Sequence, residues 1–269
     1  MTRSRLLPPA MMLALAVAHS GAEAQGAPRL HVNPRWKECS FQLDPSLTQS
    51  AWRQFTDEAG LVTFFRPISD ARPMGKGRFE LSVLQWKTNI DDRDAAWNDT
   101  FVHPDSAHWL FEGSGLEFPG LTARVGVTDR TDLGLYFTKS PGANYGFYGA
   151  QLQRAVVGSA TSAWAVSARG SYVAMYGPED LGLRSAGAEL VASRAVVLNR
   201  WVTVSPYAGV SGYLSNAHEK SAVVSLHDET VGGARGTLGA ALQISKARLG
   251  AEYTVAKVSS FSMKIGVGM

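Results

Sequence analysis

The chain has little cysteine, no long apolar run after its first residues and no strong excess of charge. Cys39 is the only cysteine among 269 residues, so no intramolecular disulfide can form. Beyond the N-terminal stretch, no segment approaches the roughly 18 consecutive apolar residues of a membrane-spanning helix. The formal net charge is +3 and the basic residues are scattered, which gives no support to a nucleic-acid partner or a charged tail.

The first 24 residues have the three-part layout of a secretory signal peptide. Arg3 and Arg5 precede an apolar run over 10–18, and the small-residue site 22–24 follows it. The apolar run is too short to span a bilayer as a helix. We therefore expect residues 1–24 to be a signal peptide that is removed on export.

From residue 78 onward, apolar residues recur with a period of two. In the last ten residues, Phe261, Met263, Ile265, Val267 and Met269 alternate with serine, lysine and glycine. The same alternation is clear over 201–214, 237–244 and 247–255, and weaker over 79–87, 144–157, 161–175 and 182–198. One face of each predicted strand is thus apolar and the other is polar or small.

Short and long connections alternate between these strands. The tight links fall at 129–131, 158–160, 199–200 and 245–246, and the longer ones at 88–117, 140–143, 176–182, 215–233 and 256–259. This alternation is typical of a membrane barrel whose turns face the periplasm and whose loops face the exterior. We predict an all-β fold over residues 78–269, a transmembrane antiparallel up-and-down β-barrel of about ten strands (8–12), preceded by a short helical or irregular segment.

The hairpin over 121–137, LTARVGVTDRTDLGLYF, resembles the R-x-G-x-T-D-R-x-D-L-G hairpin of Gram-negative outer membrane β-barrel proteins. The resemblance covers this one hairpin and marks topology, not activity. It implies the outer membrane as the location, its lipid as the surroundings and the barrel assembly machinery as a partner. Many such barrels end in an aromatic residue that this machinery reads, whereas this chain ends in Met269.

Residues 25–77 differ in character and contain five prolines. Apolar residues at 47, 51, 52 and 55 share one face of a predicted helix over 47–60, with Asp44 or Ser46 as its cap and Gly60 at its end. We expect a periplasmic segment whose helix packs on the barrel's periplasmic mouth, in preference to a plug inside the barrel.

The inward positions of the strands carry charges of both signs. The predicted lumen-lining residues are Arg124, Arg169, Glu189, Arg235, Arg248, Glu252 and Lys264. Opposite charges can pair across a narrow barrel and fill it, or they can line a thin, mildly cationic pore. Our leading interpretation is a passive pore or transporter for small solutes, and the alternative is a structural or surface-interaction barrel with a filled lumen.

The long loop over 87–117 combines aromatic residues with carboxylates and histidines. We expect Trp97, Phe101, Trp109 and Phe111 to fold inward and form a constriction, because exposure of large apolar side chains to water is unfavourable. The acidic residues and histidines match no calcium or zinc motif. The third interpretation is a barrel hydrolase. The chain resembles the omptin proteases, which are also outer membrane barrels. No catalytic residue, metal or cofactor is assigned.

Overall fold

The computed structural model describes residues 40–91, 93–102, 116–139 and 143–269. The predicted signal peptide, Cys39, Trp109 and Phe111 lie outside the described residues. Among the residues that the structure describes, no helix is long and apolar enough to cross a membrane.

The described residues form two helices and thirteen strands. The helices are α1 (Gln49–Val62) and α2 (Ala95–Asn98). The strands are β1 (Ser40–Phe41), β2 (Phe79–Thr88), β3 (Phe101–Val102), β4 (Leu116–Gly126), β5 (Thr131–Lys139), β6 (Gly146–Val157), β7 (Trp164–Tyr176), β8 (Leu181–Arg194), β9 (Val196–Val197), β10 (Val202–Glu219), β11 (Glu229–Ile244), β12 (Ala247–Val255) and β13 (Ser260–Gly268).

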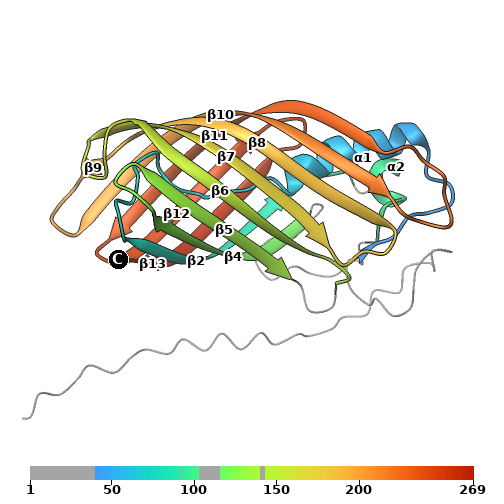
Figure 1. The fold of residues 1–269 in the computed structure, drawn as a ribbon, viewed down its shortest axis with the longest axis horizontal. Helices are drawn as coiled ribbons and strands as arrows, with labels where there is room; N and C mark the ends of the chain where they lie inside the picture. The colour runs from blue at the N-terminus through green and yellow to red at the C-terminus, as the bar shows by residue number, and fades with distance from the viewer. Residues whose placement is uncertain (1–39, 92, 103–115, 140–142) are drawn as a thin grey trace, which may run out of the picture.

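Ten of these strands close into one antiparallel barrel (Figure 1). Each long strand pairs with its neighbour in the chain, and β13 pairs with β2 to close the ring, with Ile265 opposite Val83. β9 is a short extra strand on β10, and β1 pairs with β3 apart from the barrel. The predicted fold class and strand number are confirmed.

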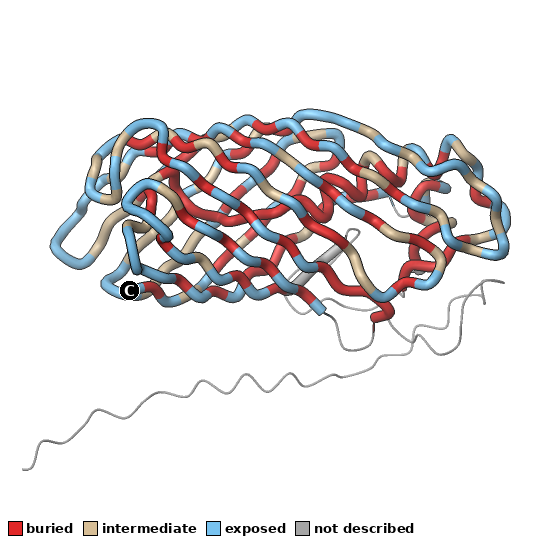
Figure 2. The backbone as a smooth tube through the Cα atoms, viewed as in Figure 1, coloured by how far each residue is buried: buried red, intermediate tan, exposed pale blue. Residues whose placement is uncertain are grey.

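The wall of the barrel separates apolar from polar side chains. On the outside, Ile265, Val210 and Leu238 are 62%, 67% and 61% exposed, whereas the inward Ser262 and Ser205 are buried. Figure 2 shows this alternation of exposed and buried residues along the strands. A closed barrel satisfies its backbone hydrogen bonds between strands, and its apolar outer belt is the surface that lipid covers. We therefore treat the barrel as spanning a membrane.

The two mouths of the barrel differ in their connections. The short-turn mouth carries the links 127–130, 158–163, 195–201 and 245–246, together with the C-terminus. The long-loop mouth carries the links between β2 and β4, β5 and β6, β7 and β8, β10 and β11, and β12 and β13. The sequence pattern thus assigned the connections to the correct two ends.

One predicted loop, 215–233, is mostly strand. β10 and β11 remain paired as far as Ala217 opposite Glu229, which leaves 220–228 as the loop. Gly232 and Gly233 concealed the period of two because they have no side chain. Gly233 also makes room for Tyr213, since a Cβ there would lie 2.6 Å from the Tyr213 hydroxyl.

The exposed belt gives a direct test of membrane insertion. Replacing Ile265 by Arg should destabilise the inserted barrel by roughly 2 to 4 kcal/mol, because a charge would then lie in lipid near mid-bilayer. Ile265→Leu, which keeps the surface apolar, is the control. The fraction of folded, heat-modifiable protein on a gel measures the effect, and equal insertion of the two variants would contradict the lipid-facing assignment.

Candidate functional site: the filled lumen

The helix α1 lies at the long-loop mouth, at the opposite end from the C-terminus (Figure 1). It packs against the ends of β8, β10 and β11 that meet there. The expectation that the helix packs on the mouth with the short turns was therefore wrong. Local periodicity gives a helix one apolar face but does not specify which surface that face will meet.

The ends of α1 also differ from the prediction. Its cap is Thr48, whose Oγ1 accepts a hydrogen bond from the Ala51 amide at 3.3 Å, and neither Asp44 nor Ser46 has this role. Gly60 does not end the helix but lies inside it, where a Cβ would overlap Ser215 of β10. The glycine therefore permits the close approach of helix and strand.

After α1, the chain runs through the lumen toward the short-turn mouth, where β2 begins at Phe79. Phe64, Phe65, Ile68 and Ala71 of this stretch are all buried. We call residues 49–77 the plug. The part of the predicted periplasmic segment that the structure describes from residue 49 on thus lies within the barrel and at its long-loop mouth.

Arg66 closes the C-terminal end of α1. Its guanidinium donates hydrogen bonds to the carbonyls of Leu61 and Val62 at 2.7 and 2.8 Å and to the hydroxyl of Ser260 at 3.0 Å. The guanidinium also lies over the ring of Trp86, 5.3 Å from its centroid. The last carbonyls of a helix lack partners within the helix, so a buried arginine there satisfies them and offsets the helix dipole.

Arg169 connects the barrel wall to the plug. Its Nη1 donates to Glu189 at 3.0 Å and its Nε to Gln153 at 2.8 Å, both on neighbouring strands. Its Nη2 donates to the carbonyls of Ser69 and Asp70 at 2.8 Å each. One buried guanidinium thus satisfies two wall residues and two plug carbonyls that have no strand of their own to pair with.

The rest of the extended plug is bound in the same way. The Ala71 amide donates to Ser193 at 3.0 Å, and its carbonyl accepts from Ser167 at 2.5 Å. Lys264 donates to the Pro67 carbonyl at 2.9 Å and to Glu80 at 2.5 Å. Since an unsatisfied buried backbone group costs about 1–3 kcal/mol, these bonds decide whether the plug can remain in the lumen.

All seven predicted lumen residues lie on the inner side of the wall. Arg169, Glu189, Arg235, Glu252 and Lys264 are buried, and Arg124 and Arg248 are partly buried. They contact each other and the plug instead of bordering an open bore. The plug residues that they bind, Ser69 to Arg72, were missed by the sequence analysis. The one available signal was the run 64–71 between the helix and the first barrel strand, which has no periodicity but contains the large apolar residues Phe64, Phe65 and Ile68.

Arg235 and Glu252 complete this set. The Arg235 guanidinium lies over the ring of Phe64, 3.6 Å from its centroid, and its Nε donates to Ser211 at 3.0 Å. Glu252 accepts a hydrogen bond from the Tyr207 hydroxyl at 3.0 Å. The aromatic contact is favourable for a guanidinium that is removed from water.

Inward glycines provide the space that the plug fills. A Cβ at Gly134 would lie 3.3 Å from Phe65, one at Gly250 would lie 2.8 Å from Ile68, and one at Gly187 would overlap the ring of Phe64. In a barrel of ten strands the lumen is narrow, so side chains at these positions would exclude the plug. The glycines on the inner face are therefore complementary to the plug's large side chains.

The long loop packs onto the plug at the long-loop mouth. Trp97 donates from its Nε1 to Glu58 of α1 at 2.6 Å, and its ring lies edge-on to Phe55 with centroids 5.1 Å apart. Phe101 packs against Phe41, with centroids 4.7 Å apart. The described aromatic residues of the predicted constriction are thus buried against α1 and β1. Trp109 and Phe111 are not described.

Comparisons with known proteins show a loose likeness in fold. No family model and no curated protein matches the chain. Among solved structures, the translocator domain of the autotransporter NalP from Neisseria meningitidis is 12% identical, covering 84% of this chain and 99% of that chain, with a TM-score of 0.43.

Two further structures are similar at the same level. The beta domain of the Bordetella autotransporter Brka is 12% identical, covers 72% of this chain and 100% of that chain, and has a TM-score of 0.39. An outer membrane channel from Pseudomonas putida F1 is 11% identical, covers 77% of this chain and 100% of that chain, and has a TM-score of 0.38. At these scores the likeness assigns neither a family nor an activity.

The fit between plug and glycines can be tested at Gly187. Gly187→Ala should lower the free energy of unfolding by about 1–3 kcal/mol, because the added methyl displaces Phe64 from its place in the lumen. Gly170→Ala is the matched control, since no atom lies within 4 Å of a Cβ there, and its effect should stay within about 0.5 kcal/mol. Urea unfolding in detergent micelles measures both. Equal stability of the two variants would contradict a tightly fitted plug.

Proposed function

We propose that this protein is an outer membrane barrel whose lumen is closed by its own plug and which acts through the surface at its long-loop mouth. The observation that carries the proposal is the binding of the plug backbone by Arg169, Lys264 and inward serines. A passive, permanently open pore needs an unobstructed lumen, whereas here the wall's polar groups are used to hold a segment of the same chain. The geometry favours the surface-interaction alternative over the open pore.

Ion pairs and hydrogen bonds fix the plug helix to the strand ends and the loop around it. Lys257 pairs with Asp57 at 3.1 Å, and the Tyr213 hydroxyl donates to the same carboxylate at 2.5 Å. Arg53 pairs with Glu229 at 2.8 Å, and Arg53 is 60% exposed. Exposed pairs contribute little stability singly, but a network that joins a helix to one loop and to the strands β10 and β11 holds a surface in one shape. Such a preformed surface suits binding of an external partner.

Electrical recording in planar bilayers tests the closed lumen. The intact protein should show no steady single-channel conductance, because the plug occupies the lumen. Deleting residues 49–74 should produce a stable conductance in protein that still shows heat-modifiable migration. Steady conductance of the intact protein, or none from a folded deletion variant, would refute the proposal.

A milder variant avoids the loss of a large segment. Ser167→Val combined with Ser193→Val removes both hydroxyls that bind Ala71. The Ala71 amide then loses its partner at a cost of about 1–3 kcal/mol, and its carbonyl keeps only the longer hydrogen bond from Gln153, at 3.3 Å. We expect brief openings from this double variant. Ser171→Val is the control, because Ser171 lies on the same strand as Ser167 but has no described bond to the plug. This variant should show no channel openings.

A gated pore is the second candidate, and one observation favours it. Several buried polar atoms without a hydrogen-bond partner among the described residues lie on the inner side of β11, β12 and β13: they belong to Arg235, Thr237, Glu252, Thr254 and Ser262. Buried polar groups of this kind are normally satisfied by ordered water. A water-filled gap between plug and wall is where a path for solutes would open. Voltage- or ligand-dependent channel openings of the intact protein would support the gated pore.

A further inference from the structure

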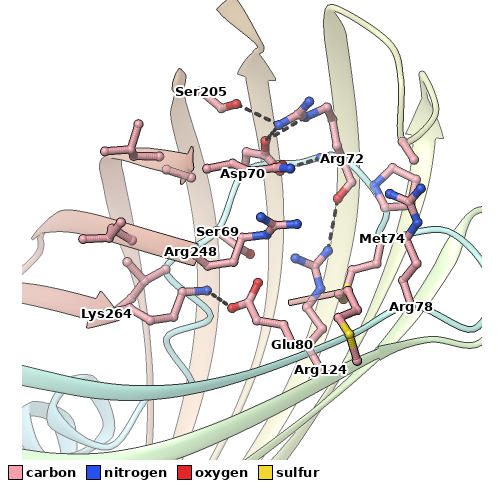
Figure 3. Close-up of a pocket in the computed structure, with 18 residues that line it drawn as sticks. Ser69, Asp70, Arg72, Met74, Arg78, Glu80, Arg124, Ser205, Arg248 and Lys264 are labelled. Atoms are coloured by element: carbon pink, nitrogen blue, oxygen red, sulfur yellow. Dashed lines mark hydrogen bonds and ion pairs between the residues drawn. The ribbon is translucent and has the colours of Figure 1, made fainter. Parts of the chain in front are cut away.

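A basic cavity lies at the short-turn mouth, where the plug leaves the lumen. It measures about 100 Å³, and five basic side chains line it against two acidic ones. The basic residues are Arg72, Arg78, Arg124, Arg248 and Lys264, and the acidic ones are Asp70 and Glu80. Figure 3 shows the side chains of Arg72, Arg124 and Arg248 entering the same space from the plug and from two parts of the barrel wall.

Three of the five cations have acidic partners. Arg72 pairs with Asp70 at 2.6 Å and Lys264 with Glu80 at 2.5 Å. Arg124 pairs with Asp132 and also donates to the Arg72 carbonyl at 3.1 Å. These pairs neutralise three of the five cations.

Arg248 and Arg78 form no ion pair with a side-chain carboxylate among the described residues, although Glu80 and Asp70 lie near enough to Arg248 to attract it. Arg248 is partly buried, and its Nη1 donates only to the carbonyls of Ser245 and Ala247, at 3.0 and 3.3 Å. Arg78 is exposed at the rim. When Asp132 is counted with the two lining carboxylates, the five cations of the cavity exceed the side-chain carboxylates by two. Removing a charge from water is unfavourable unless a counter-charge is near.

We propose that this cavity binds a phosphate-type oxyanion, as free phosphate or as a phosphate ester. A phosphate ester carries about −1.5 to −2 charge at neutral pH, which matches the two unbalanced arginines. The planar guanidinium presents two parallel N–H donors that match two oxygens of a phosphate group. A chloride ion has only one acceptor atom and cannot be bound in this bidentate way. The site is distinct from the surface at the long-loop mouth and is formed while the plug, which contributes Arg72, occupies the lumen.

Titration calorimetry of the full mature protein in a non-ionic detergent, with sodium phosphate in a constant chloride background, tests the site. We expect saturable binding of one phosphate per chain. Arg248→Gln and Arg78→Gln should each weaken it, the former by about tenfold or more, since one charge-assisted hydrogen bond is lost. Lys246→Gln is the matched control, because this exposed lysine lies at the same mouth but does not line the cavity.

Two further measurements make the result decisive. Phosphate should raise the unfolding temperature of the intact protein and of Lys246→Gln but not of Arg248→Gln, and heat-modifiable migration shows that each variant is folded. Dihexanoyl phosphatidic acid identifies the source of the bound phosphate group. Competition of this lipid with phosphate would indicate a lipid headgroup, and no competition would indicate soluble phosphate. Lack of saturable phosphate binding, or equal weakening by Arg248→Gln and Lys246→Gln, would overturn the proposal.

Discussion

The buried guanidinium of Arg169 is the contact on which the arrangement of the lumen depends. It bonds at once to Glu189 and Gln153 of the wall and to the carbonyls of Ser69 and Asp70 in the plug. A guanidinium has five N–H donors and no acceptor, so it can satisfy several carbonyls that no strand or helix pairs. Without such donors, an irregular backbone inside a barrel would be strongly disfavoured.

Shape complements these polar bonds. The plug carries large side chains, Phe64, Phe65 and Ile68, at the places where the wall carries glycine. Each strand therefore has two different faces: a mainly apolar outer face that meets lipid, and an uneven, polar inner face that meets the plug. The inner face is unusual for its mixture of small and charged residues, and the plug explains both.

The two mouths have different chemistry as a consequence of the plug's path. At the long-loop mouth, α1 brings aromatic residues such as Phe55 against Trp97, and ion pairs such as Asp57 with Lys257 surround them. At the short-turn mouth, the plug brings Arg72 to a wall that already carries Arg124 and Arg248. A mixed-charge surface thus lies at one end of the barrel and a basic cavity at the other.

The sequence by itself determined the barrel. The alternation at Phe261, Ile265 and Val267 predicted which face meets lipid, because side-chain direction along a strand depends only on the parity of the residue. The inward placement of Arg169 and Lys264 followed from the same rule. Tertiary structure alone decided what those residues bind, since Arg169 and Ser69 are 100 positions apart and no local pattern relates them. The helix was visible in the sequence, but its place in the long-loop mouth depends on glycines and polar side chains contributed by many strands.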